Sequence, residues 1–147
     1  VCSSDLNTRQ TTSNDGTISA DNTGAVVLSQ QVAFVSGSTA SVVIPAGSII
    51  NNIQVYVNDA ATSRALSLTV NGTTTSVGTI STAALGVASA AFTADAAVAN
   101  LLANVGAYNC TVTLGTESSS AGTLSVTYTA RNSDGTITPY GSGLTNS

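Results

Sequence analysis

The chain has 147 residues, which suits one domain built around a single core. Its three positive side chains, Arg9, Arg64 and Arg131, leave a net charge of −4 and too few groups to neutralise the phosphates of a nucleic acid. With no histidine and no lysine, the commonest general base and Schiff-base chemistry are absent, so we expect a protein that is not an enzyme and does not bind nucleic acid.

The remaining acidic and apolar residues define no site by their spacing. Asn14, Asp15 and Asp21 offer oxygen ligands for Ca²⁺, but turn residues that bond their own backbone are the preferred interpretation. The scarcity of aromatic residues argues against a glycosidase pair of carboxylates, and no apolar run reaches the ~20 residues of a membrane span. We therefore predict no catalytic residue, cofactor, metal site or membrane contact.

Polar ends flank a middle with regular apolar patterning. Residues 1–23 are interpreted as a polar arm, of which residues 1–6 resemble the in-frame translation of a short-read sequencing adapter and are interpreted as an assembly artefact. Residues 24–130 form the predicted domain, and residues 131–147 a polar tail. An Asp-Gly-Thr-Ile segment occurs in each end; it is interpreted as a tight turn, or as part of an arm that crosses onto a neighbouring subunit.

In chain order, the first strands are predicted at 25–35, 40–44 and 49–58. The third follows an Ile-Pro-Ala-Gly turn and has the clearest alternation, with Ile49, Ile53, Val55 and Val57 on one face. Its other face carries Ile50, Asn52, Gln54 and Tyr56.

Asn71-Gly72 predicts a two-residue hairpin between strands at 64–70 and 73–80, because both turn positions need positive φ. Residues 82–92 are alanine-rich and tolerate a helix, yet Gly86 favours an irregular or extended run. Helical spacing of apolar residues predicts a short helix at 95–104, ended by Gly106.

Two further strands are predicted at 108–114 and 124–130. Cys110 lies in the first of them and is expected to be a lone buried thiol, although a pair with Cys2 is possible in an oxidising compartment. Seven or eight short strands with one helix in a connection predict an all-β fold, an antiparallel β-sandwich. A jelly roll is the first choice and an immunoglobulin-like sandwich the second.

The segment 44–57, reading IPAGSIINNIQVYV, resembles small structural proteins of tailed bacteriophages, in particular marine ones. Asp21-Asn22-Thr23-Gly24, the hairpin segment TVNGT at 69–73 and the segment YTARNSDGT at 128–136 are also similar. The likeness covers residues 17–138. It implies a virion protein of the capsid decoration or cement type, which binds the major capsid protein and other copies of itself, often as trimers.

Two alternatives from other classes stay open. Low charge also suits a subunit of an extracellular filament or pilus assembled by strand exchange, although residues 7–23 are too polar for a typical donor strand. A sugar-binding sandwich needs exposed aromatic residues, for which Tyr56 and Tyr140 are the candidates. The predicted interface residues lie on the polar face of the 49–58 strand and in the tail: Ile50, Asn52, Gln54, Tyr56, Asp134, Ile137 and Tyr140.

Overall fold

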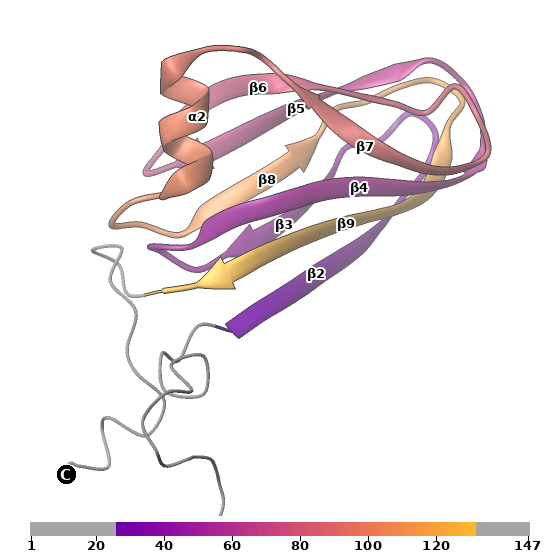
Figure 1. Ribbon diagram of the computed structural model, residues 1–147. Helices are drawn as coiled ribbons and strands as arrows, with labels where there is room; N and C mark the ends of the chain where they lie inside the picture. Colours follow the sequence, from indigo (N-terminus) through magenta and orange to yellow (C-terminus); the bar gives the residue numbers. More distant parts are fainter. Residues whose placement is uncertain (1–25, 132–147) are drawn as a thin grey trace, which may run out of the picture.

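The computed structural model describes residues 26–131, and this part of the chain is an antiparallel all-β domain with one short helix, as predicted (Figure 1). Each element follows the alternation or helical spacing of its own sequence. The strands are β2 (Val26–Phe34), β3 (Ala40–Ile44), β4 (Ile49–Asp59), β5 (Ser63–Val70), β6 (Thr73–Ser81), β7 (Gly86–Phe92), β8 (Cys110–Leu114) and β9 (Ala121–Ala130), and the helix is α2 (Ala96–Ala103).

The predicted turn and helix signals lie where the chain changes direction. Asn71 and Gly72 both have positive φ, 49° and 79°, and join β5 to β6 as a two-residue hairpin. Helix α2 lies between Asp95 and Asn104, and Gly106 follows with a φ of 95°. The ambiguous run at 82–92 becomes strand from Gly86 onward.

The strands form one sheet in the order β2-β9-β4-β7-β6-β5-β8-β3. Strand β7 joins its two halves, because its first part pairs with β4 and residues Ala90 to Phe92 pair with β6. The two outermost strands, β2 and β3, contact each other without forming a ladder, so the sheet is nearly a barrel (Figure 1).

The pairs are nested around the Asn71-Gly72 hairpin. Strand β5 pairs with β6, β4 with β7, β3 with β8 and β2 with β9, so the chain is folded as one long hairpin that is then rolled up. Additional ladders between β4 and β9 and between β5 and β8 close the roll. Val26 pairs with Ala130, and therefore the described chain enters and leaves the domain at the same end.

The core lies between the two halves of the sheet. It is filled by the inward-facing side chains of the strands, apart from those in the exposed parts of β2 and β7. Burying each large apolar side chain contributes roughly 1.5–3 kcal/mol. The fully buried members include Phe34, Ile44, Ile53, Leu66, Leu68, Ile80, Leu114 and Leu124.

A bulge in β4 changes one predicted face. The register against β9 shifts between Ile50 and Asn52, which leaves Asn51 as an extra residue. Ile50 therefore lies opposite Tyr128 and is buried, only 6% exposed, rather than on the outer face with Asn52. Its prediction as an outward residue was wrong, because strict alternation carried no signal for the bulge.

Candidate interaction surfaces

The outer face of the β2-β9-β4-β7 half is a hydroxyl and amide surface. Cross-strand register aligns its outward residues in rows across the strands. One row consists of Gln31, Ser125, Gln54 and Ser89, and the next of Ser29, Thr127 and Asn52. The hydroxyls of Ser29 and Ser125 lie 3.1 Å apart, within hydrogen-bond distance.

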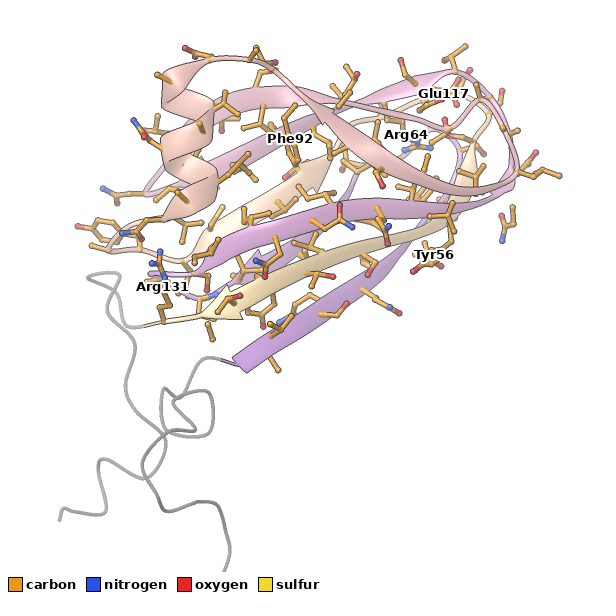
Figure 2. The ribbon with its side chains drawn as sticks, in the orientation of Figure 1. Tyr56, Arg64, Phe92, Glu117 and Arg131 are labelled. Carbon is orange, nitrogen blue, oxygen red and sulfur yellow. The ribbon has the colours of Figure 1, made fainter. Side chains whose placement is uncertain are left out.

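Tyr56 is the aromatic residue of this face. It stands between Thr123 on β9 and Val87 on β7 and is 41% exposed (Figure 2). Val87 and Leu85 beside the start of β7 are also exposed. Tyr56 with Val87 therefore gives one end of this face a small apolar area.

The structure brings three of the predicted interface residues together. Asn52 and Gln54 are half-buried on the outer face of β4, and Tyr56 follows them in the same strand. Ile50 belongs to the core, as described above. The predicted residues Asp134, Ile137 and Tyr140 lie outside the described residues.

The outer face of the opposite half has the same chemistry. One row there consists of Val43, Thr111, Thr69 and Thr74, and the next of Ser41, Thr113, Ser67 and Ser76. The hydroxyls of Thr69 and Thr74 are 2.8 Å apart. Among residues 26–131, none of the residues in the rows of either face is charged, so contacts made there depend on hydrogen bonds and packing rather than on ion pairs.

Arg64 is buried at the end of the domain where β2 leads into β3 and β8 into β9. Although charged, it is 1% exposed and lies over the ring of Phe34, 4.8 Å from its centroid. Its guanidinium donates to the Ser120 hydroxyl at 2.7 Å and to five carbonyl oxygens at 2.7–3.3 Å. These carbonyls belong to Val35, Ser38, Gly115, Glu117 and Ser120.

The guanidinium thus joins two loops that are far apart in the sequence. Burial lowers the pKa of Arg64 from its ordinary value, and the charge of Glu117 opposes this effect. The Ser120 hydroxyl and five carbonyls in two loops match the fixed fork of an arginine, which a lysine does not reproduce. The arrangement is a structural clamp, because every hydrogen-bond acceptor of the guanidinium is a loop carbonyl or the Ser120 hydroxyl.

Glu117 organises the second of these loops beside Arg64 (Figure 2). Its carboxylate accepts from the backbone amides of Ser119 and Ser120 at 2.9 and 2.7 Å. The Ser119 amide is the main cause of a pKa lowered to about 2; desolvation opposes it, and the Ser120 amide adds to it. The carboxylate is a loop anchor, held by these donors of its own loop and by the Thr62 hydroxyl, which donates to it at 3.4 Å.

Arg131 has a similar role at the opposite end of the domain (Figure 2). It donates from Nε to the Gly47 carbonyl at 2.9 Å and from its terminal nitrogen to the Ala103 carbonyl at 2.6 Å. Ala103 is the last residue of α2, where an unpaired helix carbonyl favours a cation. Arg131 therefore holds the β3–β4 corner and the helix together.

The described residues show no geometry for metal or thiol chemistry. Within residues 26–131 no cluster of His, Cys, Asp or Glu has the arrangement of a metal site, and no helix is long and apolar enough to cross a membrane. Cys110 is a free thiol buried in β8, and burial raises its pKa to about 11.

Comparison with known proteins assigns no family to this arrangement: no protein-family model, no curated protein and no solved structure matches the chain.

Sequence reasoning overlooked the Arg64 clamp, although a signal for it was present. Arg64 has the same parity as Leu66 and Leu68, so alternation places it on the inner face of β5.

Proposed function

We propose that this protein is a non-enzymatic structural component of a phage virion, a decoration or cement protein that binds the assembled capsid in many copies. The observation that carries the proposal is the outer face of the β2-β9-β4-β7 half, where Asn52, Gln54 and Tyr56 lie among serine and threonine hydroxyls without any charge. Such a face has the aromatic anchor and the hydrogen-bonding groups of a protein interface.

The nested pairing supports the same proposal. The halves β2-β9-β4-β7 and β3-β8-β5-β6 have the strand order expected of a jelly roll, two interlocked Greek keys rolled from one long hairpin. Jelly rolls are frequent in viral capsid proteins. Together with the phage-like segments at 44–57 and 69–73, this order favours a virion protein over other all-β classes.

The test uses phage particles whose genome encodes this chain. Quantitative mass spectrometry of gradient-purified particles is expected to find the protein in a fixed ratio to the major capsid protein, and electron microscopy with a specific antibody is expected to label the capsid surface. Absence from intact particles, or a few copies confined to the tail, would contradict the proposal.

The face is tested separately with a matched pair of variants. Gln54→Arg places a charge in the middle of the proposed contact, whereas Thr113→Arg places the same charge on the outer face of the opposite half. We expect Gln54→Arg to reduce rebinding to stripped capsids at least tenfold and Thr113→Arg to leave it unchanged. An equal loss of rebinding in both variants would contradict a contact through the outer face of the β2-β9-β4-β7 half.

A filament subunit is the second candidate, and the observation that favours it is the outer edge of β2, which has no hydrogen-bonded neighbour among residues 26–131. A neighbouring chain could donate a strand there, head to tail, so that subunits follow one another in a helix. Helical order of the assembled protein would favour the filament, whereas closed icosahedral order would favour the capsid.

A further inference from the structure

Among residues 26–131, strand β2 ends the sheet and is hydrogen-bonded on one side only, to β9, while β3 contacts it without forming a ladder. It pairs with β9 through nine consecutive residue pairs, from Val26 with Ala130 to Phe34 with Gly122, without a bulge. Within residues 26–131, no other backbone hydrogen bond reaches the segment from Val27 to Ala33. Figure 1 shows β2 at the border of the molecule, beyond β9. Within the described residues, alternate backbone groups along this strand therefore have no hydrogen-bond partner.

This edge lacks the features by which proteins usually prevent strand addition. Charged side chains, prolines, bulges and short length all protect an edge strand. The other end strand, β3, has five residues and is followed by Pro45. Strand β2 has nine residues with no charge and no proline, and exposes Val27 by 64% and Leu28 by 42%.

The order of residues along β2 is symmetric about Gln30. Polar residues Ser29, Gln30 and Gln31 form the centre, and apolar residues extend on both sides. If a second β2 runs antiparallel with Gln30 opposite Gln30, Val27 meets Ala33 and Leu28 meets Val32. Each pair lies on the same face in both strands, because the two positions of a pair differ by an even number of residues.

We propose that two copies of this chain associate through β2, antiparallel, about a two-fold axis at Gln30. The contact is isologous, so both copies use the same segment, only Gln30 meets its own counterpart, and the assembly closes at two. The two β2-β9-β4-β7 halves then form one continuous sheet across both molecules. Such a dimer forms with or without a capsid, and it differs from the trimer expected from the sequence.

The pairing satisfies backbone groups and covers Leu28 without bringing like charges together. Opposite side chains on the same face contribute to the stability of such a ladder. A contact one strand wide is smaller than the ~1,600 Å² of a standard interface. We therefore expect a dimer that dissociates on dilution.

The first experiment measures the mass of the purified full chain by light scattering over a dilution series. We expect twice the chain mass of 14.4 kDa at high concentration and the single mass at low concentration. A single mass at every concentration, or a trimer, would overturn the proposal. Failure of capsid binding would leave this result unchanged, so the two proposals are tested independently.

Charge swaps at Gln30 identify the axis. Gln30→Lys and Gln30→Glu each place like charges opposite one another, so each variant alone is expected to stay at the single mass. An equal mixture is expected to recover the dimer, because lysine then meets glutamate. Ser41→Lys, on the exposed face of β3, is the matched control and is expected to dimerise like the unaltered chain. No recovery in the mixture would refute the two-fold register, as would dissociation of the Ser41→Lys control.

A cysteine variant provides a second measurement that does not depend on charge. Directly opposite residues hold their Cβ atoms ~4.5–5.5 Å apart, close to the separation that a disulfide bridges. In a Cys2→Ser background, Gln30→Cys is expected to convert to a linked dimer when oxidised glutathione accepts the two thiol electrons. Ser41→Cys is expected to remain unlinked under the same conditions. Equal linking of both variants would contradict pairing at Gln30.

Discussion

The charged guanidinium of Arg64 is buried away from water. Hydrogen bonds to loop carbonyls, rather than a direct ion pair, compensate for its lost hydration. Each carbonyl it binds is pointed toward the guanidinium by the path of the β2–β3 or β8–β9 loop. Removing the cation leaves several inward-facing carbonyls without a donor, and an unsatisfied buried polar group costs about 1–3 kcal/mol. The residue therefore stabilises the loops as much as the core.

We expect Arg64→Met, which keeps the length of the stem and removes the donors, to lower the free energy of unfolding by about 3–5 kcal/mol. Arg64→Lys is expected to recover only part of this loss, because its three donors share one nitrogen. Urea denaturation measures both. Arg131→Met, which loses two hydrogen bonds at a more exposed site, is the control and is expected to cost less. An equal cost for Arg64→Met and Arg131→Met would contradict the clamp.

Glu117 predicts acid sensitivity at the same end of the domain. Its pKa in the folded protein is about 2, below the ordinary 4.5. The stabilisation from the charged carboxylate is thus fully present above pH 4.5 and is lost as the pH falls toward 2. We expect the melting temperature to fall as the pH is lowered from 4.5 to 2. In Glu117→Gln, the melting temperature should change less with pH over this range. If the melting temperatures of Glu117→Gln and of the unaltered chain fall equally with pH, Glu117 is not the cause of the acid sensitivity.

At the residue scale, the sequence placed side chains well wherever alternation was unbroken. Gln54 and Tyr56 lie on the outer face of β4, as predicted. Ile50 was misplaced because one extra residue at the bulge exchanges the faces on its N-terminal side. The role of Arg64 could not be predicted from its residue type alone. Most of its partners are backbone carbonyls of two loops, and the positions of these loops depend on the whole fold.

At the scale of elements, β9 approaches β4 closely because Gly122 has no side chain. A Cβ there would overlap the carbonyl oxygen of Tyr56 and lie 3.0 Å from the ring of Phe34. Gly122 pairs with Val57 on one side and with Phe34 on the other, so both neighbouring strands lie against it. The packing of Phe34 under Arg64 depends on this close approach.

We therefore expect Gly122→Ala to force β4 and β9 apart and to lower the free energy of unfolding by about 1–3 kcal/mol. Gly115→Ala is the matched control, because its Cβ would meet the nearest atom, the Ala65 carbonyl oxygen, at 3.4 Å. We expect the control to stay within about 0.5 kcal/mol of the unaltered chain. Chemical denaturation of the two variants side by side makes the comparison, and similar losses in both would contradict the steric explanation.

Most elements were predictable because their signals are local. The Asn71-Gly72 turn needs positive φ at two adjacent residues, and Gly106 marks the end of the helix region. The run at 82–92 was ambiguous, since its alanines tolerate a helix whereas Gly86 favours an irregular or extended run. Its strand is decided by pairing with the preceding strand β6 and with β4, which is more distant in the sequence.

At the scale of the whole molecule, the order of strands depends on contacts between distant residues. Alternation identifies strands but not their partners, so the sequence predicted an antiparallel all-β class without determining which strand lies beside which. Here the outermost pair of the long hairpin, β2 with β9, joins the two ends of the described chain. That pair forms only after the chain has closed a large loop, which costs conformational entropy.

This topology predicts slow folding. We expect the main refolding phase in the range of milliseconds to seconds, as for other all-β domains rich in non-local pairs, rather than in microseconds. Stopped-flow circular dichroism after a brief unfolding pulse measures this phase free of slow proline isomerisation. A dominant microsecond phase would contradict the importance of the β2–β9 closure.

The pairing of Val26 with Ala130 also has a mechanical consequence. Tension applied through the two ends of the chain would pull β2 and β9 apart at one end of their ladder, so the hydrogen bonds would break one after another, as in a zipper. Tension applied along a β-strand loads many bonds of a ladder at once. A protein with this fold resists stress well when neighbours grip the faces or edges of its sheet, and poorly when it is held by its two ends.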